Sequence, residues 1–101
     1  MLTATITSTG AASAADILAA ATGVRYVIHK IELTVTAAAA VKVHEGADAT
    51  TSRLFYGDLA ANGGFVMEWP GGRVLATNTA LKLTTDAGNT HGTVHYTKSQ
   101  D

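Results

Sequence analysis

The sequence predicts an all-β fold, an antiparallel jelly-roll β-sandwich of about eight strands in a single domain over residues 1–101. Three observations support this prediction. Apolar and polar residues alternate with the period of two that half-buried strands show. Turn residues recur at a spacing of roughly ten residues, as they do between the short strands of a sandwich. No segment carries a convincing apolar stripe of an amphipathic helix.

The longest candidate strand covers residues 24–36, which contain no Gly, Pro, Asn or Asp and are rich in β-branched and aromatic residues. The alternation places one set of residues on the buried face: Val27, His29, Ile31, Leu33 and Val35. We expect this segment to be the central strand of a sheet. Its first part is apolar on the second face as well, through Val24, Tyr26 and Ile28, which predicts a cover on both sides there.

The segments before it are less regular. Residues 2–7 alternate Leu, Ala and Ile with Thr, which predicts a first strand that ends at Gly10. Residues 11–21 are rich in alanine, which favours a helix, and Asp16 could cap one. Ile17 and Leu18 are the only large side chains there, however. We therefore expect a loop followed by a short strand at residues 16–20.

Five further strands are predicted after the central segment, at residues 41–45, 52–59, 65–69, 80–84 and 91–97. A turn at residues 45–48 follows the first of them. Asn62-Gly63 accepts the positive φ values of tight turns, which predicts that strands 52–59 and 65–69 form an antiparallel hairpin. Pro70-Gly71-Gly72 is expected to end the second strand of that hairpin.

Composition limits the classes of function. Charged residues are 15 % of the chain and the net charge is −1, which argues against a nucleic-acid-binding surface. The chain has no cysteine, so disulfides and thiolate chemistry are absent. The longest apolar run, residues 17–21, is too short to span a membrane, and the N-terminal segment lacks the basic region of a signal peptide. We expect neither membrane nor nucleic-acid partners.

The residue pattern also predicts no catalytic, cofactor or metal site. His91 and His95 share a face of a predicted strand, where i, i+4 positions lie roughly 13 Å apart, too far for one metal ion. His29 is expected to be a hydrogen-bonded core or interface residue, and His44 points to the face opposite Glu45. The serines lack a Gly-x-Ser-x-Gly turn, and most aspartates fall in predicted turns. We therefore expect the protein not to be an enzyme.

Several apolar and aromatic residues are candidates for a subunit interface: Val24, Tyr26, Ile28, Phe55, Tyr56 and Trp69. Phe55 and Tyr56 are adjacent and must face opposite ways, so one of them is exposed or meets a partner. A mean hydropathy of +0.17 with a net charge near zero indicates self-association. The alternative cover for Val24, Tyr26 and Ile28 is residues 11–21 of the same chain.

Segments 23–37, 41–43, 59–67, 80–83 and 92–96 resemble small structural proteins of tailed bacteriophages, of the capsid decoration (cement) or head-fibre type. The resemblance implies a jelly-roll fold, a homotrimer, the major capsid protein as partner and a place on the capsid surface of a virion made in the host cytoplasm. It carries over no catalytic residue, and it matches residues 11–21 less well.

Two other functions remain open at this point. The first is a fibre or baseplate module with a receptor- or glycan-binding role, and the second is a stand-alone carbohydrate-binding or hydrolytic sandwich. A glycan binder is expected to group exposed aromatic residues and carboxylates at one end of the sandwich. A decoration protein is expected to have a smooth flank of alanine, threonine and aliphatic residues.

Overall fold

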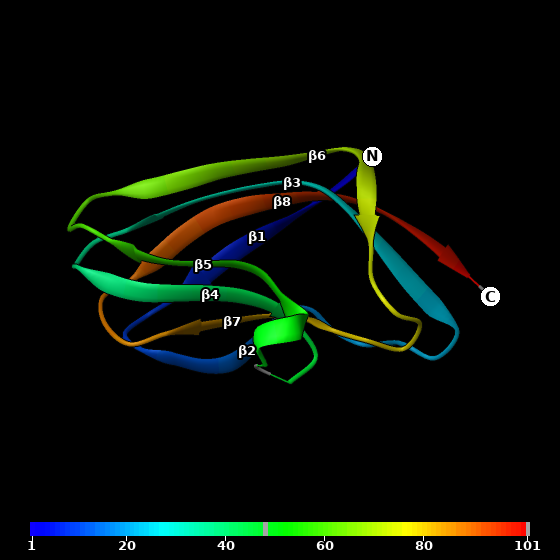
Figure 1. The fold of residues 1–101 in the computed structure, drawn as a ribbon, viewed down its shortest axis with the longest axis horizontal. Coiled ribbons are helices and arrows are strands. Elements are labelled where there is room, and N and C mark those ends of the chain that lie inside the picture. Colours follow the sequence, from blue (N-terminus) through cyan, green and yellow to red (C-terminus); the bar gives the residue numbers. More distant parts are fainter. Residues whose placement is uncertain (48, 101) are drawn as a thin grey trace.

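The alternating segments of the sequence form eight strands that pack as two layers (Figure 1). The computed structural model describes residues 1–47 and 49–100. In chain order the strands are β1 (Leu2–Ser8), β2 (Ala12–Leu18), β3 (Val24–Val35), β4 (Ala39–Glu45), β5 (Arg53–Leu59), β6 (Gly64–Val74), β7 (Leu81–Thr85) and β8 (Thr90–Gln100). A 3-10 turn, η1 (Thr50–Ser52), precedes β5. The prediction of an all-β, eight-stranded antiparallel sandwich is confirmed.

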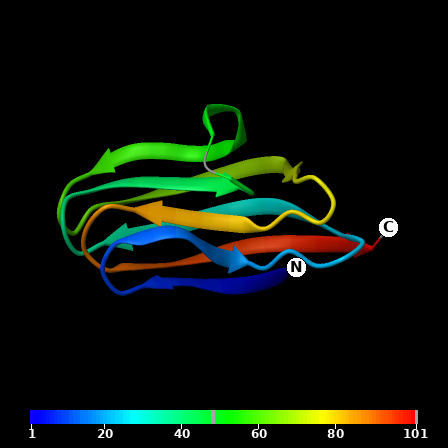
Figure 2. The same cartoon turned by 90° about the horizontal axis from the view of Figure 1, so that it is seen from below.

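The two sheets have the strand orders β1-β8-β3-β6 and β2-β7-β4-β5. The first four strands therefore pair in reverse order with the last four, as in one long hairpin that is rolled up on itself. Each connection except that between β4 and β5 passes from one sheet to the other (Figure 2). This arrangement is consistent with the jelly-roll topology.

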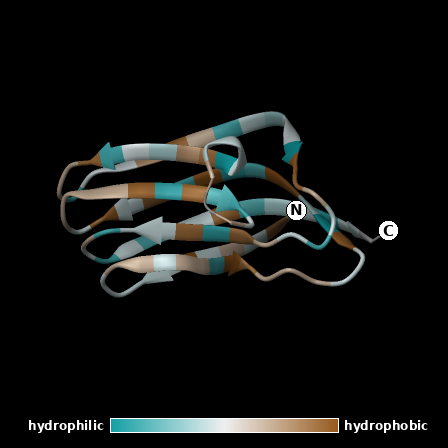
Figure 3. Ribbon diagram, turned by 60° about the horizontal axis from the view of Figure 1, so that its bottom comes forward, coloured by the Kyte–Doolittle hydropathy of each residue, from teal (hydrophilic) through white to brown (hydrophobic). Residues whose placement is uncertain are grey.

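The core lies between the two sheets, where the inward-facing residues of the strands meet. Figure 3 shows hydrophobic and hydrophilic positions following one another along the strands. Its buried apolar side chains are Ile6, Leu18, Tyr26, Ile28, Ile31, Leu33, Val35, Ala39, Val41, Val43, Leu54, Leu75, Leu81, Leu83 and Val94. β6 contributes Phe65 and Trp69, which are half-buried against this cluster. The burial of this whole apolar cluster away from water is the main stabilising contribution to the fold.

β3 is the central strand that the sequence predicts, because it pairs with β8 on one side and β6 on the other. Its predicted register is wrong in the first half. The pairing shifts between Ile28 and Lys30, so His29 forms a β-bulge and the alternation changes face there. Tyr26 and Ile28 consequently point into the core, while Val27 and His29 are only half-buried.

Opposite this bulge, β6 makes a larger excursion. Glu68 pairs with Lys30 and Arg73 with Ile28, so four residues of β6, numbers 69–72, stand against the single residue His29. The predicted end of this strand at Pro70-Gly71-Gly72 is therefore wrong, since pairing resumes at Arg73. Figure 1 shows β6 bending sharply near its C-terminal end.

The predicted pairing of strands 52–59 and 65–69 is also wrong, because β5 and β6 belong to different sheets. The turn itself is present: Asn62 has a φ of +61°, and the Gly63 amide donates a hydrogen bond to the Ala60 carbonyl at 2.8 Å. It forms an arch from one sheet to the other, and the rings of Phe55 and Phe65 stack across the arch at 3.6 Å. A tight turn reverses the chain but does not decide whether the two strands pair or pack face to face.

The other elements differ from prediction mainly at their ends. The loop and short strand expected over residues 11–21 are instead the strand β2, which begins four residues earlier than predicted, at Ala12 rather than Asp16, and ends at Leu18. Asp48, the last residue of the turn predicted at 45–48, lies outside the described residues. The described part of the chain contains no helix that is long and apolar enough to cross a membrane.

Candidate functional site

A large, shallow hollow lies on the outer face of the β1-β8-β3-β6 sheet. We call it the outer-face depression. It is broad and open, has a volume of about 740 Å³ and is crossed by all four strands. The side chains that face it form two rows across the sheet, Thr5–Thr93–Glu32–Val66 and Thr7–His91–Thr34–Gly64. Four threonines, one glycine, Val66 and His91 thus surround a single carboxylate, that of Glu32.

Two glycines keep the strands close together in this region. Gly92 on β8 pairs with Leu33 on β3, and a Cβ atom built on Gly92 would overlap the Glu32 carbonyl oxygen and lie 2.7 Å from Leu33 Cα. A Cβ atom on Gly64 would overlap the Leu33 carbonyl oxygen and lie 2.9 Å from the Thr34 methyl group. Because the obstacles include backbone atoms, neither strand can take a side chain here without moving.

Replacing Gly92 by alanine is therefore expected to lower the free energy of unfolding by about 1–3 kcal/mol through overpacking. Urea unfolding followed by circular dichroism measures this loss. The neighbouring substitution Thr93→Ala, on the open outer face, is the control and should change stability by less than about 0.5 kcal/mol. Equal stability of the two variants would show that β8 does not pass as close to β3 as the structure indicates.

Three of the four histidines lie on or near the same sheet. His95 on β8 has its Nε2 atom 3.6 Å from a carboxylate oxygen of Glu32, and this pair stands at the edge of the outer-face depression. His29, at the bulge of β3, shares a hydrogen bond of 3.1 Å with the Thr97 hydroxyl. His91 is exposed within the depression. Among the described residues, no three His, Cys, Asp or Glu side chains gather in a way that could hold a metal ion.

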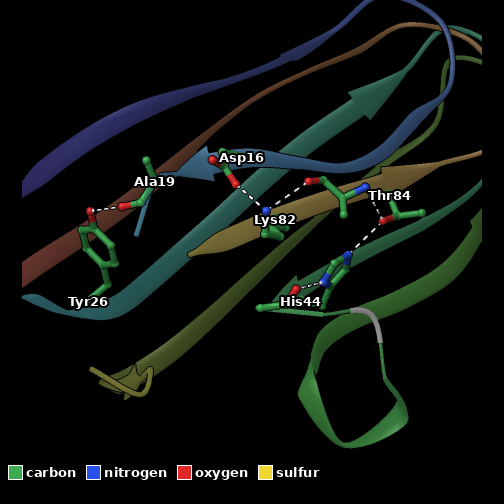
Figure 4. Close-up of polar contacts among 8 residues, drawn as sticks. Asp16, Ala19, Tyr26, His44, Lys82 and Thr84 are labelled. Atoms are coloured by element: carbon green, nitrogen blue, oxygen red, sulfur yellow. Dashed lines mark hydrogen bonds and ion pairs between the residues drawn. The ribbon is translucent and has the colours of Figure 1, made fainter. Parts of the chain in front are cut away.

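The burial of His44 was not predicted from the sequence. The residue is fully buried, and Figure 4 shows its ring pointing toward Thr84. A carbonyl oxygen can only accept, so Nδ1 donates to the Gly46 carbonyl at 2.8 Å. In a ring with one hydrogen, Nε2 then accepts from the Thr84 hydroxyl at 2.9 Å. The same hydroxyl oxygen accepts the Ala14 amide at 3.0 Å, so the network joins β4, β7 and β2.

Two predicted interface residues prove to be covered by their own chain. Ile28 has no exposed surface and Tyr26 is buried. The Tyr26 hydroxyl donates to the Ala19 carbonyl at 2.7 Å (Figure 4), and its ring packs edge-on against Tyr96. The chain around Ala19 thus supplies part of the cover that a second subunit was expected to provide. This corrects the expectation of a second, uncovered apolar face on this strand.

The remaining interface candidates are divided between core and surface. Val24, Phe55 and Trp69 are half-buried against the core. Tyr56 is 55 % exposed on the outer face of the other sheet, so the predicted opposition of Phe55 and Tyr56 is confirmed. The Arg53 guanidinium lies 4.8 Å from the centre of the Tyr56 ring, and the Lys42 ammonium lies 5.7 Å from it.

The outer-face depression was not predicted from the sequence. In the sequence, its threonines can be recognised only as the polar residues of alternating segments. Which of them meet across the sheet depends on the register between four strands that are far apart in the chain.

In comparisons with known proteins, no protein-family model, no curated protein and no solved structure matches the chain.

Proposed function

We propose that this protein is a virion structural protein that decorates a phage capsid and reinforces the lattice of major capsid subunits. The resemblance of its strand and turn segments to phage decoration proteins suggests the role. The observation that carries the proposal is the outer-face depression, a wide surface formed mainly by threonine, glycine and valine residues, with one histidine and one carboxylate. Such a surface suits contact with another protein surface, since it offers area and shape rather than an enclosed pocket.

Val66 is the residue of this surface best placed to anchor a partner. It is 61 % exposed, lies on the edge strand β6 and is the only large aliphatic side chain in the two rows that face the depression. Burying its exposed apolar surface would favour binding at about 25 cal/mol per Å². A contact of this kind, repeated at many equivalent positions of a shell, adds up to a large stabilisation of the shell.

The proposal is tested by co-sedimentation of the purified protein with empty capsids assembled from the major capsid protein of the same genome. We expect saturable binding, which Val66→Glu weakens at least tenfold, because a charge would then be buried against the capsid. Val74→Glu is the matched control, since Val74 is on the same strand, is 56 % exposed and does not line the depression. It should bind within twofold of the wild type. No capsid binding by the wild type, or equal losses in both variants, would contradict the proposal.

The proposal includes self-association in threes, the number that the resemblance implies, and a structural rather than catalytic role. Its alternative is a fibre or baseplate module that binds a receptor or glycan. Tyr56 favours this alternative, because it is an exposed aromatic residue with the exposed Asp58 two residues away on the same strand. Against it, Arg53 and Lys42 lie over the ring and occupy space that a stacked sugar would need. Glycan binding that Tyr56→Ala abolishes would support the alternative.

A further inference from the structure

The four edge strands of the sandwich are not equally protected against pairing with another chain. β2 has two register shifts and a positive φ of +49° at Ala14. β5 has a register shift against β4 and carries Arg53 and Asp58. β6 carries Glu68 and Pro70 and is interrupted by the excursion opposite the β3 bulge. Bulges, charges and proline are the features by which sheet proteins keep their edges from pairing with other strands.

β1 has none of these features within its described range, Leu2–Ser8. Its seven residues pair with β8 in one continuous register, and none is charged. Thr3, Thr5 and Thr7 are exposed on its outer face. In an antiparallel pair, alternate residues turn their N–H and C=O groups away from the partner strand, so the free side of β1 offers unpaired backbone groups.

The surroundings of β1 are also nearly neutral. The first charged side chain after the N-terminus is Asp16 on β2, which lines a small depression together with Thr5 and Thr7. Its carboxylate is already bonded to the Lys82 ammonium at 2.7 Å, and Figure 4 shows the two side chains meeting. A strand that approaches β1 therefore meets hydrogen-bonding groups and hydroxyls, with the adjacent carboxylate already paired.

We infer that β1 pairs antiparallel with β1 of a second copy of this chain. A two-fold axis at Thr5 would place the two Thr5 side chains opposite each other and Thr3 opposite Thr7 of the second copy, so that threonine meets threonine along the whole outer row. On the inner side, Ala4 would face Ile6 and the exposed Leu2 would face Ser8. All seven residues of β1 would pair, and no charges would meet.

Because β1 is complementary to itself in this pairing, a second copy of the chain is favoured over other partners. A strand that pairs antiparallel with itself about a two-fold axis presents the same chemistry on both sides, which is the requirement of an isologous contact. The pairing would join two four-stranded sheets into one continuous sheet, the mode of association in which main-chain hydrogen bonds supply the affinity.

The contact goes beyond the proposed function and does not depend on it. Because it is two-fold, it predicts an even number of copies in solution: two if it acts alone, and six if the three-fold association of the proposed function also forms. Light scattering of the purified wild-type protein measures this number. A particle of one or three chains would overturn the inference. Three chains would leave the proposed function standing with its three-fold association, whereas a single chain would remove that association in solution and leave capsid binding to be decided by co-sedimentation.

The variant Thr5→Lys tests the position of the contact. It would place two ammonium groups opposite each other at the axis, and we expect it to halve the particle mass. Thr5 is exposed, so the fold should be kept, and circular dichroism checks this. Ser13→Lys is the control, because Ser13 is exposed on the bulged edge strand β2. It should leave the mass unchanged. Equal masses for Thr5→Lys and the wild type would contradict the contact.

Two double variants test the register without changing the axis residue. In the inferred pairing, Thr3→Lys combined with Thr7→Glu brings opposite charges together, so the wild-type mass should be kept. Thr3→Lys combined with Thr7→Lys brings like charges together, so the mass should fall by half. Both variants change only exposed side chains of β1. If the two double variants have the same mass, the register centred on Thr5 is wrong.

Discussion

Replacing Ile28 by alanine is expected to lower the free energy of unfolding by about 2–5 kcal/mol, the usual loss for a buried isoleucine in a well-packed core. Ile28 has no exposed surface and belongs to the cluster between the two sheets. The loss combines the transfer of apolar surface back to water with the cavity that the smaller side chain leaves. For a domain of this size, much of the total stability would be removed.

The matched control is the adjacent substitution Val27→Ala. Val27 is half-buried on the other face of β3, so its truncation should lower the free energy of unfolding by about 1 kcal/mol or less. Urea unfolding of the two variants gives both values under the same conditions. A larger loss for Val27→Ala than for Ile28→Ala would mean that the register without a bulge is the correct one.

Ile28 and Val27 show for which part of β3 the alternation in the sequence predicts the buried face correctly. Alternation identified the central strand, since Ile31, Leu33 and Val35 are buried as predicted. It failed N-terminal to His29, because one bulged residue changes the face of every residue before it. The signal for the bulge lies on another strand, in the excursion at residues 69–72, and a single strand's pattern does not contain it.

The arch at Asn62-Gly63 illustrates a second limit. The turn chemistry was predicted correctly, but β5 pairs with β4 and β6 pairs with β3. Large apolar residues such as Phe55 and Phe65 pack equally well side by side in one sheet or face to face between two sheets. Here the sandwich uses the second arrangement. The choice depends on the whole strand order, which is a property of the fold and not of the turn.

The outer-face depression and the β1 edge have different relations to the sequence. The residues that line the depression can be identified only when the pairing of four strands is known, so the depression was found in the structure and not in the sequence. The neutrality of β1 is evident in residues 2–8, but its meaning depends on β1 lying at an edge. If both proposals hold, the contact between copies would lie beside the capsid-binding surface, because Thr5 and Thr7 belong to the edge strand and also line the depression.

Replacing His44 by phenylalanine is expected to lower the free energy of unfolding by about 1–3 kcal/mol, because two partly buried polar groups lose their partner. Phenylalanine fills the space of the ring but bonds neither the Gly46 carbonyl nor the Thr84 hydroxyl. The exposed residue His91 provides the control: His91→Phe should change stability by less than about 0.5 kcal/mol.

The role of His44 as the centre of a network, and not as a simple space-filling residue, is tested by adding Thr84→Val. This second substitution removes the hydroxyl that His44 shares with the Ala14 amide. If the three groups act together, the double variant should lose less than the sum of the single losses, by about 0.5–3 kcal/mol. Losses that add within about 0.5 kcal/mol would mean that the two side chains stabilise the β2-β7-β4 region independently. β2 would then be held on its sheet by its backbone pairing with β7 and by the Asp16–Lys82 ion pair, without a contribution from His44.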